Sequence, residues 1–318
     1  MKAIVVACLE PEHLEHCLQS LDLWLLPQDV IVLNNANQTE HVTRIAAIAA
    51  RHRMETMRLQ NHTHGENTLP YIHQALCNLS RAHPGETILK IDEDIMLVAK
   101  AAQFEAPPGA FVIPNITINN FTTKNYLAEF QPALHAKVID HPWLWHFPHP
   151  RTGVDYREAL FRFIYEADPL RFMEHCARNA GKETVIGRSE WEKNYLWSRV
   201  DDAHKRRGGW RLMPKWFVKK FRRASTHVEH RGISSTAMSF RADDYLALVG
   251  KQRGIEEVLI AEAVYHDRAR YVVKHDIFCH HVNYWSVREM VKQHAALVAG
   301  FCERLLTGYR SCQSTRVS

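Results

Sequence analysis

The sequence predicts an α/β fold in which helices cover both faces of a mostly parallel sheet. Short apolar runs rich in β-branched residues alternate with segments whose apolar residues recur every three or four positions. Strands that alternate with helices in this way form parallel sheets joined by right-handed crossovers. The chain of 318 residues, with 46% hydrophobic and 24% charged residues, is long enough for one globular core with a large insertion.

Predicted strands and helices alternate regularly through the amino-terminal half. The strands cover residues 2–8, 29–33, 54–59, 86–91 and 110–115. The helices cover residues 11–25, 42–52 and 70–82. In sheets of this kind ligands bind beyond the carboxyl ends of the strands. We therefore expect the polar segments after the first, second and fourth strands to meet in one crevice.

The pattern changes after residue 120, because the segment 121–231 is rich in Trp, His, Pro and Arg. Helical periodicity recurs there at residues 156–164 and 168–179. We interpret this segment as a large, mainly helical insertion. The α/β pattern resumes with a strand at residues 232–241, followed by a helix to about residue 250.

The sequence therefore divides into one α/β domain and a short carboxy-terminal part. The domain covers residues 1–285 and consists of the halves 1–120 and 232–285 with the insertion between them. The second half continues with a helical segment at residues 255–264 and a strand at residues 270–274. Residues 286–318 form a predicted helix to about residue 306 and then a polar tail that we expect to be disordered.

Charge, cysteines and hydropathy narrow the class of protein. The formal net charge is +5, and nine cations without any acidic residue lie in residues 205–223, here called the basic stripe. The seven cysteines are scattered, so neither a disulfide framework nor a structural zinc site is expected. No apolar run approaches the roughly 20 residues of a membrane span, and the first run is too short for a signal peptide. We expect a cytoplasmic protein, soluble or peripheral on the inner face of the membrane.

The strongest local feature is the acidic triplet Asp92-Glu93-Asp94, which follows a predicted buried strand. In an extended segment, residues two apart point the same way. Asp92 and Asp94 are therefore expected to present two carboxylates to one point. Hard oxygen ligands suit Mg²⁺ or Mn²⁺ that bridge a diphosphate. A solvated acidic turn is the alternative, and the position at the end of a buried strand favours the metal site.

A second acidic pair, Glu256-Glu257, opens a predicted helix, and His280 and His281 follow 24 and 25 residues after Glu256. Taken alone, the pair is what a favourable helix N-terminus requires. Together with the histidines and the upstream triplet, it becomes a candidate general base that faces a metal site. A neutral imidazole is a common ligand for Mn²⁺ and similar ions.

In this order the parts resemble glycosyltransferase family 2 and its GT-A relatives. The resemblance covers roughly residues 2–120 and 232–285. It rests on the order of the parts, because each motif alone is short. The matching segments are residues 16–21 (HCLQSL), 32–39 (VLNNANQT), 89–94 (LKIDED) and 234–241 (SSTAMSFR) with Val249-Gly250, then Glu256-Glu257 and His281.

The resemblance implies a Rossmann-like GT-A fold and an inverting transfer from a nucleotide diphosphate sugar to a hydroxyl acceptor. Synthesis of cell-surface polysaccharide or lipopolysaccharide is the setting it suggests. The implied roles are donor binding by Asn34, Asn35, Asp92 and Glu93, binding of Mn²⁺ or Mg²⁺ by Asp92, Asp94 and His281, and general-base catalysis by Glu257, with Glu256 as the fallback. The chain departs from the family at two points. Asn34 and Asn35 stand where the family usually has an acidic residue that contacts the base or ribose, and Glu257 is one methylene longer than the family's Asp.

Two other functions stay open. A sugar nucleotidyltransferase would also use two carboxylates and a metal, but it usually needs a Gly-rich basic loop after the first strand, which residues 8–11 do not provide. A nucleic-acid-binding protein could stack bases on the aromatic residues of the basic stripe. For the stripe we favour contact with an anionic membrane or a lipid-linked glycan acceptor. An exposed basic helix without a role ranks second and nucleic acid third. We expect no second metal site at His141, His146 and His149.

Overall fold

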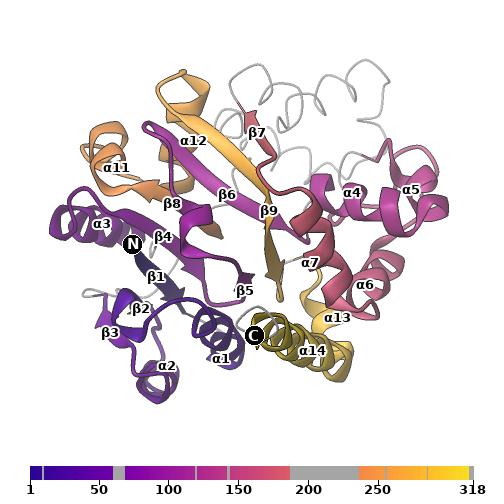
Figure 1. Ribbon diagram of the computed structural model, residues 1–318, viewed down its shortest axis with the longest axis horizontal. Coiled ribbons are helices and arrows are strands. Elements are labelled where there is room, and N and C mark those ends of the chain that lie inside the picture. Colours follow the sequence, from indigo (N-terminus) through magenta and orange to yellow (C-terminus); the bar gives the residue numbers. More distant parts are fainter. Residues whose placement is uncertain are drawn as a thin grey trace, which may run out of the picture.

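The computed structural model describes residues 1–8, 11–59, 69–118, 120–141, 144–186, 236–254, 256–284 and 286–314. These residues form a nine-stranded sheet in the order β3-β2-β1-β4-β8-β6-β9-β5, with β7 paired to β9 beside this path (Figure 1). The strands are β1 (Lys2–Ala7), β2 (Val30–Asn34), β3 (Glu55–Arg58), β4 (Thr87–Asp92), β5 (Ile95–Val98), β6 (Ala110–Ile116), β7 (Glu183–Ile186), β8 (Ala237–Arg241) and β9 (Arg270–His281). In the part of the chain that the structure describes, no helix has the length and apolar character of a membrane span.

The strand directions confirm the predicted mixed α/β fold with a mostly parallel sheet. The pairs β1–β2, β1–β4, β2–β3 and β6–β9 are parallel. The strands β5, β7 and β8 run against their neighbours. The five strands predicted in the amino-terminal half match β1, β2, β3, β4 and β6 to within one residue at each end. Strands β5 and β7 were not predicted.

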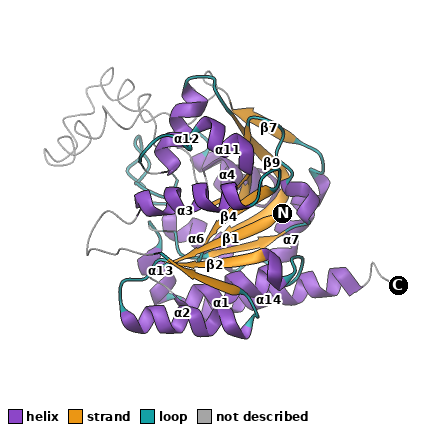
Figure 2. Ribbon diagram, turned by 90° about the vertical axis from the view of Figure 1, so that its left-hand side faces the viewer, coloured by secondary structure: helices purple, strands orange, loops and turns teal. Residues whose placement is uncertain are grey.

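Helices cover the sheet on both faces (Figure 2). One face packs against α1 (Pro11–Leu21) and α2 (Thr39–Arg51), and the other packs against α3 (Leu69–Ala82), α11 (Ala242–Leu248) and α12 (Glu256–Tyr265). Side chains of β4 alternate between these layers as the period of a strand requires. Ile88 lies in the cluster that contains residues of α3 and α12, whereas Leu89 and Ile91 lie in the cluster that contains residues of α1 and α2.

The described residues of the segment interpreted as an insertion pack at the end of the sheet formed by β9 and β5. Its described helices are α4 (Asn120–Phe130), α5 (Pro132–Val138), α6 (Arg157–Tyr165) and α7 (Pro169–Arg178). The last two confirm the predicted helical pieces. The α7 helix begins where Asp168 caps the backbone N–H of Leu170 at 3.0 Å and Pro169 occupies the first turn. The segment also supplies β7, which extends the sheet beside the first half of β9.

Strand β9 pairs with β6 in two different registers. Ile113 of β6 lies opposite Val273, but Asn115 lies opposite Phe278. Two steps along β6 therefore correspond to five along β9, which leaves three extra residues in β9. The bulge falls within residues 274–277, of which Lys274 still pairs with Glu183 of β7, and it separates the half of β9 that pairs with β7 from the half that carries His281.

The carboxy-terminal helix differs from the prediction. It is divided at His294 into α13 (Arg288–Gln293) and α14 (Ala295–Ser314). The expectation of a disordered tail after residue 306 was wrong for residues 307–314, which are helical. Tertiary contacts explain the extension. The Tyr309 hydroxyl donates to the Ala99 carbonyl at 3.0 Å, and Gly308 lies so close to Leu170 of α7 that a Cβ there would come within 2.6 Å.

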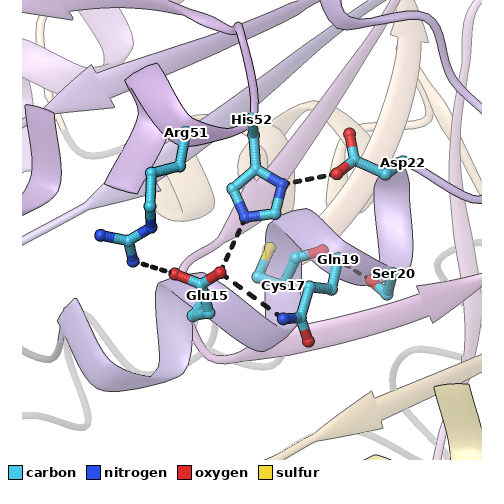
Figure 3. A network of polar contacts seen from close by, with 7 residues as sticks. All are labelled: Glu15, Cys17, Gln19, Ser20, Asp22, Arg51 and His52. Carbon is cyan, nitrogen blue, oxygen red and sulfur yellow. Dashed lines mark hydrogen bonds and ion pairs between the residues drawn. The ribbon is translucent and has the colours of Figure 1, made fainter. Parts of the chain in front are cut away.

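A polar network holds α1 against the end of α2 (Figure 3). Glu15 of α1 accepts from Arg51 and lies 3.0 Å from the Nε2 atom of His52. His52 also contacts Asp22 through its other ring nitrogen, and Gln19 reaches Glu15 from the same helix. Two helices that flank the amino-terminal strands are thereby joined by charge as well as by apolar contact.

The change Glu15→Gln should lower the free energy of unfolding at pH 7 by at most about 1 kcal/mol, because the network is partly exposed. Partial burial alone would raise the pKa of Glu15, but Arg51 and His52 outweigh it and lower the pKa from 4.5. A carboxyl group with a lowered folded-state pKa stabilises the protein above its unfolded pKa and loses this contribution as the pH falls. The difference between wild type and variant should therefore shrink below about pH 4.5. Urea denaturation of both proteins at pH 7 and pH 3.5 measures this difference in the free energy of unfolding.

The matched control is Glu12→Gln on the same helix, since Glu12 forms a looser, exposed pair with Arg44 at 3.8 Å. It should change stability less than Glu15→Gln. An equal difference for Glu15→Gln at both pH values would contradict the assigned role of the carboxylate.

Candidate functional site

The carboxyl ends of β1, β2 and β4 meet, as the fold prediction required. The backbone N–H of Asn35 donates to the Ala7 carbonyl at 2.7 Å, and the N–H of Glu93 donates to the Val6 carbonyl at 3.1 Å. The Glu93 carboxylate accepts the N–H of Cys8 at 2.9 Å. Glu93, predicted to bind the donor, therefore also ties the end of β4 to the end of β1.

Asn34 and Asn35 are both only 2% exposed, but their side chains are used differently. Asn34 donates from Nδ2 to the Val42 carbonyl at 2.9 Å, and its Oδ1 accepts the N–H of Ala36 at 3.3 Å. Its amide therefore shapes the turn after β2. The Oδ1 atom of Asn35 has no hydrogen-bond partner among the described residues. Since a buried acceptor without a partner is unfavourable, Asn35 is the better candidate for accepting an N–H of a ligand.

The acidic triplet does not have the extended geometry that its spacing suggested. Strand β4 ends at Asp92, and Glu93 and Asp94 form a turn that leads into β5. The rule that residues two apart point the same way holds within a strand and ends with it. As a result, the two aspartates have different partners.

Asp92 is paired with a buried lysine. Its Oδ1 atom lies 2.7 Å from the Nζ atom of Lys90, and the Oε1 atom of Glu256 lies 3.7 Å from the same nitrogen. Lys90 and Glu256 are each 2% exposed. The end of β4 and the start of α12, more than 160 residues apart in the sequence, are thus joined by one ammonium group.

The charges of this cluster shift its ionisation. Burial lowers the pKa of Lys90, but Asp92 and Glu256 outweigh it and raise that pKa. Burial raises the pKa of Asp92 to about 6, with Asp94 and Glu257 adding to the rise and Lys90 opposing it. Burial likewise raises the pKa of Glu256 to about 7, with Lys90 opposing and Glu257 adding. The acidic groups of both motifs therefore act on one another.

Asp94 is paired with the predicted histidine of β9. The Nε2 atom of His281 lies 3.1 Å from the Oδ2 atom of Asp94, and the Asp94 carbonyl accepts the N–H of Val282 at 2.8 Å. Burial alone would raise the pKa of Asp94, but His281 and, more weakly, His13 of α1 lower it. Burial would lower the pKa of His281, and Asp94 outweighs it and raises that pKa.

The separation of this pair suits a divalent ion. Two ligands at about 2.1 Å on adjacent positions of an octahedron are about 3 Å apart, which is close to the observed 3.1 Å. No group of three or more His, Cys, Asp and Glu side chains that could hold a metal ion occurs among the described residues. Mg²⁺ commonly takes one or two carboxylates and completes its shell with water and substrate phosphates. Asp94 and His281 are therefore the candidate ligands of the implied ion, with Asp94 as the carboxylate, while Asp92 is engaged by Lys90.

His280 and His281 lie on opposite faces of β9, as neighbours in a strand should. The Nδ1 atom of His280 is 2.8 Å from the Thr117 hydroxyl oxygen, and its ring packs against Tyr165 and Phe301. Burial, with a smaller contribution from His281, lowers the pKa of His280 to about 3. His280 is therefore a neutral residue of the core, and His281 is the one that reaches the site.

Glu256 and Glu257 occupy the first turn of α12 but differ in access. Glu256 is 2% exposed and faces Lys90, whereas Glu257 is half-buried. Successive residues of a helix point about 100° apart, so the two carboxylates lie on different sides of the helix. A sugar hydroxyl can reach a half-buried side chain more readily than one that is 2% exposed. The geometry therefore favours Glu257 over Glu256 as the base.

Sequence reasoning missed Lys90, His13 and Tyr284. Lys90 was detectable, because it stands two positions before Asp92 in the same strand and so shares its face. The position of His13 depends on how α1 lies over the turn after β4, which local patterns do not report. Tyr284 packs edge-on to His281 with ring centroids 5.2 Å apart.

The segment 121–231 contacts the site through His146, whose partner Tyr284 follows β9. The Tyr284 hydroxyl is 3.0 Å from the Nε2 atom of His146. The other two histidines of that segment have local structural contacts, since His141 is 2.9 Å from the Phe147 carbonyl and His149 is 2.9 Å from Asp140. Of the three, His146 is the one that links the insertion to the Asp94–His281 pair.

Comparison with known proteins gives partial similarities. No family model and no curated protein sequence matches this chain. The crystal structure of S. aureus TarS matches with a TM-score of 0.27 and 19% identity over 36% of this chain and 22% of that one. The glycosyltransferase GlyE of Streptococcus pneumoniae TIGR4 matches with a TM-score of 0.26 and 13% identity over 51% of this chain and 43% of that one. Its apo form matches with a TM-score of 0.24 and 11% identity. The aligned part spans less than half of each of these chains, and such TM-scores do not establish a shared fold.

Proposed function

We propose that this protein is a metal-dependent glycosyltransferase that moves a sugar from a nucleotide diphosphate donor to a hydroxyl group of a glycan or lipid-linked glycan. The observation that carries the proposal is the meeting of three distant segments at one edge of the sheet. Lys90 of β4 contacts both Asp92 at the end of the same strand and Glu256 of α12, and Asp94 contacts His281 of β9. A strand-end acidic pair, a helix-start acidic pair and a later histidine are the elements of the family that the sequence resembles.

In this proposal the turns after β1, β2 and β4 bind the nucleotide. Asn35 offers a buried carbonyl oxygen to an N–H of the base or to a ribose hydroxyl. Asp94 and His281 would hold Mn²⁺ or Mg²⁺, whose chemistry there is to neutralise the negative charge that develops on the departing diphosphate. We assign this pair rather than Asp92, predicted as a further ligand, because Asp92 is paired with Lys90.

Glu257 acts on the acceptor side. Its carboxylate takes the proton of the acceptor hydroxyl while the hydroxyl oxygen forms a bond to the anomeric carbon and the bond from that carbon to the diphosphate oxygen breaks. Attack from the face opposite the leaving group inverts the anomeric configuration. The proposal requires Glu257 and the Asp94–His281 pair to lie on opposite sides of the donor sugar.

No observation among the described residues favours either alternative, the sugar nucleotidyltransferase or the nucleic-acid-binding protein. The basic stripe lies outside them, so membrane contact through residues 205–223, like a cytoplasmic location, stays a prediction. Partners of the proposed enzyme are the nucleotide sugar and the glycan acceptor, and nucleic acid is not expected.

A thermal-shift screen of nucleotide diphosphate sugars, with and without Mn²⁺, tests the proposal. We expect one donor to raise the melting temperature in the presence of Mn²⁺, because a ligand at 100 times its Kd stabilises a protein by about 2.7 kcal/mol. The matching nucleoside monophosphate, which lacks the diphosphate, should shift it less. A shift by nucleoside triphosphates with sugar phosphates would support the nucleotidyltransferase instead, and a shift by oligonucleotides alone would support the binding protein.

A further inference from the structure

Lys90 is a cation buried between the two acidic motifs. It follows Ile88 by two positions in β4, so it points to the side of the sheet that α12 covers. Its Nζ atom lies 2.7 Å from Asp92 and 3.7 Å from Glu256. One ammonium group thus contacts the carboxylates of both the strand that is proposed to bind the donor and the helix that is proposed to carry the base.

Fold stability alone gives little reason for this arrangement. Burying an ion pair costs desolvation energy that often cancels the attraction, and apolar side chains of similar volume are frequently as stable or more stable. The neighbouring positions Ile88, Leu89 and Ile91 of β4 are apolar and buried. Stability therefore does not explain a lysine at position 90. Its contacts indicate that it positions the groups around it.

The contact fixes the first turn of α12. Lys90 is paired with the Oε1 atom of Glu256, and the Oε2 atom of Glu256 has no hydrogen-bond partner among the described residues. Besides a hydrogen bond to its own backbone, this carboxylate has the ammonium group as its charged contact with β4. Glu257 is the next residue of the same turn, so the position of its carboxylate depends on this contact.

We propose that Lys90 is a positioning residue of the transfer reaction, which ties the first turn of α12 to the end of β4 and so sets the distance between Glu257 and the donor. This inference rests on the proposed glycosyltransferase function. Because Lys90 is 2% exposed, it acts through Glu256 and does not touch the donor.

The variants Lys90→Met, Lys90→Arg and the double variant Lys90→Met/Glu256→Gln test the role. Lys90→Met should lower kcat by about 10- to 100-fold with the donor KM changed less than about threefold, because a misplacement of about 1 Å can cost 10²-fold in rate. Lys90→Arg should recover part of the loss. The double variant removes the buried carboxylate that the single change leaves uncompensated, so it should regain melting temperature without regaining kcat.

The matched control is Lys2→Met, which breaks the ion pair of Lys2 with Asp29 at the opposite end of the neighbouring strand and should leave kcat unchanged. Hydrogen exchange supplies a readout that does not depend on activity. Lys90→Met, or the double variant if the single change fails to fold, should speed exchange in the first turn of α12 more than in α3.

Three results would overturn the inference. The first is recovery of both the melting temperature and kcat in the double variant. The second is a tenfold rise in the donor KM of Lys90→Met with kcat unchanged. The third is a rate of hydrogen exchange in the first turn of α12 that equals that of the wild type. The failure of the proposed function looks different, because then the wild-type protein transfers no sugar from any nucleotide diphosphate donor while the exchange result still reports on the contact between Lys90 and Glu256.

Discussion

Glu257→Gln is expected to lower kcat by about 10²- to 10⁴-fold, which is the usual contribution of a general base. The amide has nearly the shape of the carboxylate but cannot take the proton of the acceptor hydroxyl. The proposed function places the donor at the turns after β1, β2 and β4, so its affinity should stay close to that of the wild type. Steady-state transfer rates at saturating donor and acceptor, together with calorimetric titration of the donor, measure the two effects separately.

Two further variants, a control and a comparison, show how this result should be interpreted. Glu262→Gln alters another half-buried glutamate of α12 and should leave kcat unchanged. Glu256→Gln should lower kcat by no more than about tenfold, since the amide oxygen can still accept from Lys90. If Glu256→Gln gives the large loss and Glu257→Gln does not, the motif is right and the residue is wrong. If neither does, the pair holds no base.

Asp94→Asn should lower kcat/KM by about 10³-fold, because an ion that neutralises charge in the transition state contributes several kcal/mol. The change removes one of the two side chains that fit the ion and leaves His281 as the other. Mn²⁺ affinity, measured by calorimetric titration in the presence of the nucleoside diphosphate, should fall in parallel. The double variant Asp94→Asn/His281→Asn should be little worse than either single variant, since ligands of one ion act as a unit.

Asp29→Asn is the control, because Asp29 pairs with Lys2 at the amino-terminal end of β1, away from the carboxyl ends of the strands that form the site. It should leave both Mn²⁺ affinity and rate unchanged. Transfer by Asp94→Asn at nearly the wild-type rate in the presence of EDTA would show that the metal assignment is wrong.

Sequence patterns predicted the amino-terminal half of the fold well because its signals are local. Strands such as β1 and β2 are buried on both faces and read as continuous apolar runs, and the helices between them show a clear period. The same reasoning placed the acidic triplet at the carboxyl end of a strand, whereas His281 was selected over His280 by the resemblance to the glycosyltransferase family. The position of the triplet needed only the order of the elements and the rule that ligands bind at strand ends.

The parts that were missed depend on tertiary contacts. Strand β5 is four residues long and starts directly after the turn at Asp94, so its pairing with β9 has no local signal. The last turns of α14 are polar and are held by Gly308 and Tyr309 against distant segments. The separate partners of Asp92 and Asp94 follow from the end of β4 at Asp92, and boundaries of elements are the least predictable feature of a sequence.

The bulge in β9 makes this strand tolerant of length changes in one place and intolerant in another. Residues added or removed between Lys274 and Phe278 alter the surplus of β9 over β6, so the pairing of residues 278–281 with β5 can stay as it is. A single residue added between Ile277 and His281 would instead exchange the faces of the following side chains, because the period of a strand is two. For an insertion before His280, that residue would lose its contact with Thr117 and move to the face of Asp94, and His281 would leave that face. The surplus thus lies between the half of β9 that β7 pairs with and the half that sets the spacing of the site.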